Sequence, residues 1–129
     1  MEESKKYNPN LSDNLIVKLT FEFALNIVKY SEQLESKRKF AIANQLIRSG
    51  TSIGANVRES QNAESKADFI HKMKIAAKEA DETEYWLLIA SHSENYPNCN
   101  ELLSKILSIK KVLSKIIGTS KGGSGQSPN

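Results

Sequence analysis

Residues 45–59 have the sequence Gln45-Leu-Ile-Arg-Ser-Gly-Thr-Ser-Ile-Gly-Ala-Asn-Val-Arg-Glu59, and two stripes recur in and around it at helical spacing. Steps of four, four, three and four place one set of apolar and small residues on a single helix face: Ile42, Leu46, Gly50, Ile53 and Val57. A polar ribbon lies beside them: Gln45, Ser49, Ser52, Asn56 and Glu59. A fully solvated face more often carries Lys and Glu, so we expect this ribbon to be half buried and to need hydrogen-bond partners.

Three other segments have apolar residues at helical spacing. The first is expected over about 13–35, with Ser12 or Asp13 as its N-terminal cap. Another is expected over 65–92, where residues from Phe69 to Ala90 alternate steps of four and three, the period of left-handed helix packing. Its start matches the capping-box pattern, in which Ser65 accepts the N–H of Asp68 and the Asp68 carboxylate accepts the N–H of Ser65. The last is expected over about 100–118, after the turn at Pro97.

With the helix over about 40–61, these segments predict an all-α fold: an antiparallel up-down-up-down four-helix bundle over residues 1–118. Small residues, among them Ser49, Gly50 and Gly54, are expected to let the second and third helices approach closely. Each Gly costs about 1 kcal/mol relative to Ala in a helix interior, which close contact can offset. A loop that breaks the second helix at either Gly is the alternative. Residues 119–129 are expected to form a flexible tail.

Composition favours one cytoplasmic domain without a membrane partner. The 129 residues suffice for a single core, and no apolar run approaches the ~20 residues needed to cross a bilayer. Cys99 is the single cysteine, so an intrachain disulfide is excluded and a reducing compartment is favoured. The net charge is +3, but five Lys and no acid follow Glu101. This asymmetry is compatible with an anionic partner at the C-terminal end.

Two helices carry a second apolar stripe that the core of one bundle does not need. On the first helix it contains Val17, Phe21, Ala24 and Val28, and on the third it contains Ile75, Glu82, Trp86 and Ile89. Large apolar residues on a second face are typical of an interface, so we predict a homo-oligomer. The alternative is that these are scattered exposed residues, which are common singly.

A carboxylate inside an apolar stripe must be paired, hydrogen-bonded or protonated. Arg48 and Arg58 are the candidate charged partners of Glu82, with Ser52 and Asn56 as neutral donors. We favour a polar clasp that fixes interface register over a general acid or base, because no nucleophile or metal cluster accompanies Glu82.

Three motifs occur in order: residues 45–59 quoted above, then Glu64-Ser-Lys-Ala-Asp-Phe-Ile-His-Lys72, then Glu82-Thr-Glu-Tyr-Trp-Leu87. From about Phe21 to Ser114 the chain resembles the "four helix bundle protein" family, whose first members were found in intervening sequences of bacterial large-subunit ribosomal RNA genes. The resemblance implies an antiparallel bundle that assembles as a ring-shaped homopentamer without known catalytic activity. The accessory protein of diversity-generating retroelements, a pentamer that binds nucleic acid, is more distantly similar.

The family pattern implies packing and interface roles for residues on two helices. On the second helix these are Gln45, Arg48, Ser49, Ser52, Ile53, Asn56 and Glu59. On the third they are Asp68, Phe69, Glu82, Tyr85, Trp86 and Leu87. They coincide with the polar ribbon and the second stripe.

The sequence contains no set of residues that predicts catalysis. A di-metal site in a bundle needs paired Glu-x-x-His motifs, and Asp68-x-x-His71 is a single near miss. Cys99 has no basic neighbour to activate it as a nucleophile. We therefore expect no enzyme activity, no catalytic residue, no metal or other cofactor, and no small-molecule substrate.

Basic clusters make RNA or DNA the leading candidate partner. Lys37, Arg38 and Lys39 form one cluster, and Lys110, Lys111 and Lys115 form another. A ring of five would gather about five copies of each, and every neutralised phosphate adds affinity through counterion release. No interleaved aromatic residues indicate base stacking, so binding should depend on the backbone. The alternatives are that these lysines serve solubility, or that the protein is a structural adaptor that docks another protein without nucleic acid.

Overall fold

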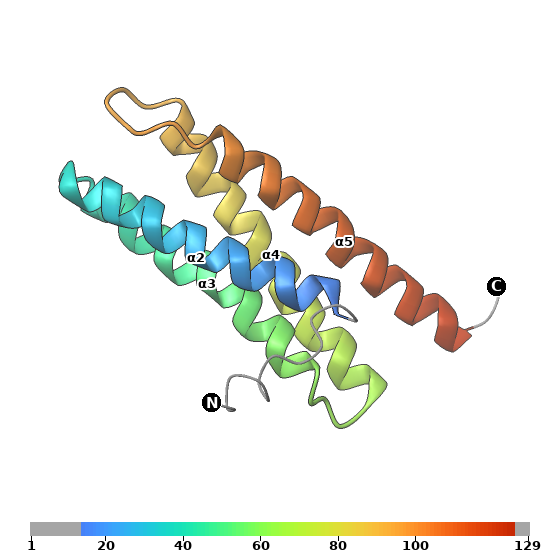
Figure 1. Ribbon diagram of the computed structural model, residues 1–129. Coiled ribbons are helices and arrows are strands. Elements are labelled where there is room, and N and C mark those ends of the chain that lie inside the picture. Colours follow the sequence, from blue (N-terminus) through green and yellow to red (C-terminus); the bar gives the residue numbers. More distant parts are fainter. Residues whose placement is uncertain (1–13, 126–129) are drawn as a thin grey trace.

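The computed structural model describes residues 14–125, which form four helices and contain no strand. These are α2 (Leu15–Ser36), α3 (Phe40–Ser60), α4 (Lys66–Ser91) and α5 (Asn100–Gly125). Figure 1 shows the four helices lying lengthwise beside one another, with the α2–α3 turn and the α4–α5 loop at one end and the α3–α4 turn at the other. The prediction of an all-α fold of four helices is confirmed.

Helix ends differ from the predictions at two places. Ser65 Oγ accepts the main-chain N–H of Asp68 at 3.0 Å as predicted, but the Asp68 carboxylate accepts the N–H of Glu64, at 3.3 Å, and not that of Ser65. α5 continues to Gly125, so residues 119–125 are helical where a flexible tail was expected. No proline occurs between residues 100 and 127 to stop the helix, and Gly118 is accommodated inside it. Ser12 and Asp13, the candidate caps of the first helix, lie outside the described residues.

All four helices contribute to one core. Its largest fully buried side chains are Phe23, Ile27, Leu34, Leu46, Ile53, Met73, Leu87, Ile106, Ile109 and Leu113. The alternating residues of α4 face inward as their spacing predicts, because Met73, Ala76, Ala80, Leu87 and Ala90 are all buried. The short residues among them leave room for neighbouring helices to pack closely.

Gly50 and Gly54 lie in an unbroken helix and face α2, not α4. A Cβ added at Gly50 would lie 2.9 Å from Cγ1 of Ile27, and one at Gly54 would lie 3.2 Å from the carbonyl oxygen of Thr20. The expected loop alternative is therefore wrong, and so is the expectation that these two glycines bring α3 close to α4. They bring it close to α2 because both lie on the side of α3 that α2 covers. Ser49 does face α4, where its hydroxyl meets Thr83.

Side chains tie the α4–α5 loop to the rest of the bundle. The Tyr30 hydroxyl donates to the Pro97 carbonyl at 2.7 Å, and the Cys99 thiol donates to the Leu87 carbonyl at 3.4 Å. Burial raises the pKa of the Cys99 thiol. Burial and the neighbouring Cys99 together raise the pKa of the Tyr30 hydroxyl. The ammonium of Lys39 lies 5.1 Å from the ring centroid of Tyr96. These contacts fix the end of the bundle at which α5 begins.

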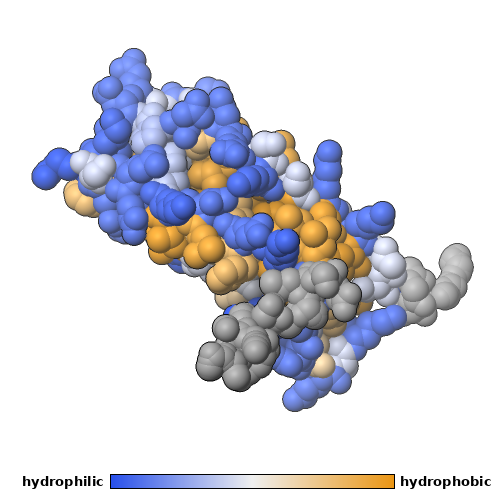
Figure 2. All heavy atoms as spheres, viewed as in Figure 1, coloured by the Kyte–Doolittle hydropathy of each residue, from blue (hydrophilic) through white to orange (hydrophobic). Residues whose placement is uncertain are grey.

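α5 packs closely on α4 and over a shorter stretch on α2. Figure 2 shows hydrophobic residues along the seam between α2 and α5 and over the middle of α2. Among the helices of the described part, none is long and apolar enough to cross a membrane.

Candidate self-association surface

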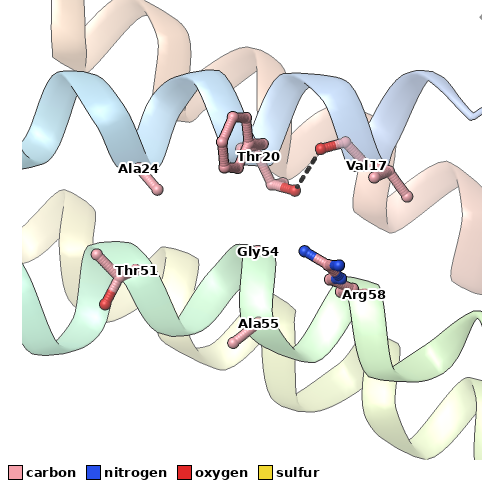
Figure 3. A pocket seen from close by; sticks show the side chains of 8 residues that line it. Val17, Thr20, Ala24, Thr51, Gly54, Ala55 and Arg58 are labelled. Atoms are coloured by element: carbon pink, nitrogen blue, oxygen red, sulfur yellow. Dashed lines mark hydrogen bonds between the residues drawn. The ribbon is translucent and has the colours of Figure 1, made fainter. Parts of the chain in front are cut away.

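The close approach of α2 and α3 forms a shallow apolar groove. Val17, Phe21 and Ala24 line it from α2, and Thr51, Gly54, Ala55 and Arg58 line it from α3, around a volume of about 290 Å³ (Figure 3). Phe21 is 54% exposed, and Arg58 reaches from α3 toward α2 at one end. Apart from Arg58, the residues that line the groove from α3 are small, and Phe21 is left exposed at its side.

The predicted stripe on α2 is thus divided between two roles. Val17 is half buried and packs against the core of its own protomer, whereas Phe21 is exposed. Ala24 and Val28 are half buried along the same side of the helix. The part of the stripe that the protomer leaves uncovered is therefore centred on Phe21.

A polar cluster on the outer side of α3 and α4 surrounds Glu82. Its carboxylate forms an ion pair with Arg48 and accepts the indole N–H of Trp86 at 3.0 Å. Arg48 also donates to Gln45 at 3.2 Å and pairs with Glu79 at 3.5 Å. Glu82 is therefore paired with Arg48 of its own chain, and the predicted role of this pair in fixing interface register stays a prediction.

The other predicted partners of Glu82 lie elsewhere. Arg58 lines the groove toward α2, on a different side of α3. Ser52 and Asn56 donate to main-chain carbonyls one turn back in their own helix, those of Arg48 at 2.6 Å and Ser52 at 2.9 Å. Short polar side chains on a helix readily form such bonds, so Ser52 and Asn56 do not need the Glu82 carboxylate as a hydrogen-bond partner.

The rest of the polar ribbon also finds its partners inside the protomer. Ser49 and Thr83 are fully buried, and the Thr83 hydroxyl donates to Ser49 Oγ at 2.9 Å, which joins α3 to α4. Ser49 in turn donates to the Gln45 carbonyl at 3.0 Å. At the other end, Glu59 is exposed and lies 3.5 Å from the ammonium of Lys72. The prediction that this ribbon is half buried holds for Gln45, Ser52 and Asn56, while Ser49 is buried and Glu59 is exposed.

On α4 the predicted second stripe is half buried. Trp86 rests against the protomer core, with its ring edge-on to Tyr85 at a centroid distance of 5.2 Å. Ile75 and Ile89 are half buried on either side of it along the helix. Tyr85, which the apolar spacing does not select, is the most exposed aromatic residue here at 58%. The α4 surface therefore presents Tyr85 and the two isoleucines, with Trp86 as their support.

The basic residues predicted to contact nucleic acid are dispersed over the bundle. Lys37 and Arg38 are exposed in the α2–α3 turn, where Arg38 has a positive φ of 64°, while Lys39 is half buried beside Tyr96. Lys111 and Lys115 are exposed on α5. The two clusters are separated along the bundle, because the turn lies at the end where α5 begins.

Lys110 belongs to a different arrangement that sequence reasoning missed. Its ammonium lies 2.8 Å from Asp81 and 2.5 Å from Glu84, and these hydrogen bonds raise its pKa. Lys110 therefore links α5 to α4, and two carboxylates already compensate the ammonium that was predicted to contact nucleic acid. Asp81 and Glu84 lie three residues apart on α4, a spacing that signals neighbouring carboxylates on a helix surface.

Within the described residues, no three His, Cys, Asp or Glu side chains gather in a way that could hold a metal ion. His71 is exposed beside the start of α4, and Cys99 is buried. The arrangement offers packing surfaces and charged side chains.

Sequence comparison connects this geometry to known proteins. The family model of the 23S rRNA-intervening sequence protein matches residues 12–115, which include α2, α3, α4 and most of α5. The chain belongs to the 23S rRNA-intervening sequence protein family. No curated protein is matched.

A solved structure supports the membership in this family. The 1.70 Å crystal structure of a protein with unknown function from the S23 ribosomal protein family of Bacteroides thetaiotaomicron VPI-5482 is similar to this chain, with 42% sequence identity and a TM-score of 0.76. The match covers 79% of this chain and 97% of the other. The predicted resemblance to proteins of ribosomal RNA intervening sequences is confirmed.

Proposed function

We propose that this family member is a non-enzymatic homo-oligomer, built from antiparallel up-down-up-down bundles in a ring-shaped homopentamer, that binds the backbone of RNA or DNA. The observation that carries the nucleic-acid part is the surface of α5. Lys111 and Lys115 are exposed there, they form no ion pair among the described residues, and no acid occurs between residues 102 and 121.

Two unlike surfaces support the self-association part. The α2–α3 groove presents Phe21 and small residues, while the α4 surface presents Tyr85, Ile75 and Ile89. A contact between two different patches is head-to-tail, and it closes into a ring when the rotation between neighbours permits. An aromatic side chain of one copy in the groove of the next would cover apolar surface on both.

Assembly strengthens a surface that is weakly charged in one copy. Two free lysines on one protomer neutralise few phosphates, but a ring of five presents about ten, and affinity grows with each phosphate contacted. The expected binding is steeply salt-dependent and weakly selective for base sequence, since no base-reading element accompanies the lysines.

Fluorescence anisotropy with labelled single-stranded RNA and DNA at several salt concentrations tests this proposal. The double variant Lys111→Glu, Lys115→Glu is expected to weaken binding at least tenfold with an unchanged oligomer mass in light scattering. Lys66→Glu, Lys74→Glu is the matched control, because both lysines are exposed on α4. Equal binding by the wild type and the α5 variant would refute the role of α5. For the assembly, Phe21→Ser should lower the oligomer mass, and an unchanged mass would refute the groove as an interface.

A structural adaptor that docks another protein is the second candidate function. Leu88 is 42% exposed on α4 and Leu107 is 46% exposed on α5, so apolar side chains remain available outside the two proposed interface surfaces. The same experiment separates the two functions. An adaptor would show no binding to the labelled nucleic acid at low salt, whereas the proposed function requires an affinity that falls steeply as the salt concentration rises.

A further inference from the structure

A second groove lies between α2 and α5, next to the loop at which α5 begins. It encloses about 240 Å³, and its polar lining comes from both helices and the loop: Asn26, Lys29, Gln33, Asn98, Glu101 and Lys105. Neither Lys29 nor Lys105 belongs to the basic clusters that the sequence suggests. They lie 76 residues apart in the chain and line the same groove only because α2 and α5 pack side by side here.

We propose that this groove is a phosphate-binding subsite, in which Lys29 and Lys105 hold a backbone phosphate of the bound nucleic acid from two sides. Both ammonium groups are on exposed residues and form no ion pair among the residues described. Glu101 is the one carboxylate among the side chains that line the groove, so two positive charges face one negative charge. Lysine binds phosphate as a compact charge with several donors, which suits a ligand with acceptors in all directions.

The neutral side chains of the groove add donors and a rigid floor. The Asn98 side-chain oxygen accepts the main-chain N–H of Asn100 at 2.8 Å, which leaves the Asn98 amide nitrogen to donate to a ligand. Tyr30 and Cys99 line the floor with their donors already committed to Pro97 and Leu87. The positive end of the α5 helix dipole lies beside the groove and favours an anion there.

The position of the groove extends the binding surface on α5. Lys111 follows Lys105 by about 9 Å along the helix axis and Lys115 follows by about 15 Å, at 1.5 Å per residue, and at 100° per residue they lie about 120° and 80° around the axis from Lys105. A strand that enters the subsite at Lys105 therefore reaches these exposed lysines only by crossing α5 obliquely. The inference rests on the proposed function for the source of the phosphate, and on the groove alone for the existence of the subsite.

Lysine acylation followed by mass spectrometry tests the subsite in the full-length protein. Each lysine is labelled without ligand, with pyrophosphate and with a 12-nucleotide single-stranded RNA. Protection of Lys29 and Lys105 but not of Lys18 and Lys74 supports the subsite, since all four are exposed. If RNA protects Lys29 and Lys105 and pyrophosphate does not, or if RNA protects them at a much lower concentration of phosphate groups than pyrophosphate does, the ligand is a backbone phosphate. Protection by pyrophosphate without RNA binding supports the subsite for a free phosphate compound and refutes the proposed nucleic-acid function.

Affinity measurements on three variants complete the test. Lys29→Gln, Lys105→Gln should weaken RNA or pyrophosphate binding at least fivefold, while Lys18→Gln, Lys74→Gln should change it less than twofold. Glu101→Gln should tighten binding about twofold to fivefold, because it removes the carboxylate that lines the groove. Unprotected Lys29 and Lys105 in the presence of RNA that protects Lys111 and Lys115 would overturn the subsite and leave the proposed function standing. Unchanged labelling with both ligands overturns both.

Discussion

Gly50→Ala is expected to destabilise the protein, although alanine is the better helix former. The added Cβ would lie 2.9 Å from Cγ1 and 3.0 Å from Cγ2 of Ile27, where about 3.5–4.0 Å is the favourable carbon–carbon separation. Ile27 is fully buried, and its branched side chain has one strongly preferred rotamer in a helix. It therefore cannot turn aside, and α2 and α3 must separate by several tenths of an ångström.

Two effects of opposite sign determine the magnitude. Overpacking a close-packed core costs about 1–3 kcal/mol, and replacing Gly by Ala in a helix interior gains about 0.5–1 kcal/mol. We therefore expect the free energy of unfolding to fall by roughly 1 kcal/mol, between limits of about 0 and 2.5 kcal/mol. Gly118→Ala is the matched control because nothing lies within 4 Å of its added Cβ in α5, so only the propensity gain applies and the free energy should rise by about 0.5–1 kcal/mol.

Urea unfolding followed by circular dichroism at 222 nm measures both variants, at one protein concentration because the proposed association would contribute to stability. The double variant Ile27→Ala, Gly50→Ala should lose less stability than the sum of the two single variants, since Ile27→Ala removes both clashing carbons. A Gly50→Ala protein as stable as Gly118→Ala would refute the close approach of α2 and α3.

Three other perturbations have defined outcomes. Glu82→Gln should lower the free energy of unfolding by no more than about 1 kcal/mol, because the ion pair with Arg48 is partly exposed. The same variant should shift the fluorescence of Trp86, because the indole N–H loses its charged acceptor, and an unchanged spectrum would contradict the hydrogen bond between Glu82 and Trp86. Raising the pH above about 9 should reduce the urea concentration at the unfolding midpoint. Burial raises the folded-state pKa of Cys99 and Tyr30 above their ordinary values of 9.0 and 10.0, so the unfolded chain loses these protons at a lower pH than the folded protein does. The double variant Cys99→Ala, Tyr30→Phe should flatten this decline. Lys110→Met should weaken packing of α5 on α4 and raise amide hydrogen exchange in residues 110–121, and unchanged exchange would show that the ion pairs with Asp81 and Glu84 are dispensable.

Periodicity alone predicted the four helices because each has a long apolar face. The alternating residues of α4 are the best example, since the spacing from Met73 to Ala90 identifies six buried positions. The need of Glu82 for a donor was also predictable, because an acid inside an apolar stripe must be paired, but the sequence left Arg48 and Arg58 both open as the partner. In both cases the constraint acts within one or two helices.

Which neighbour a helix face contacts depends on the arrangement of the whole bundle, and that is where the predictions were wrong. Gly50 and Gly54 signal a close contact but not its partner, so they were assigned to α4 when they face α2. Arg48 and Arg58 are ten residues apart on one helix, and a rotation of about 1,000° at 100° per residue places them on different sides. Likewise, nothing local to Lys110 shows that two carboxylates of α4 lie beside it.

The distribution of charge has a consequence for how assembly and binding respond to salt. The Lys110 pairs and the Arg48 cluster join α4 to its neighbouring helices, while Lys29, Lys105, Lys111 and Lys115 form no ion pair among the described residues. Helix packing rests mainly on apolar burial, which moderate salt does not weaken, and the same holds for the proposed contact at Phe21. Salt should therefore weaken the proposed binding of a polyanion at concentrations that leave the proposed oligomer intact, because the unpaired lysines act by long-range attraction and apolar contacts do not.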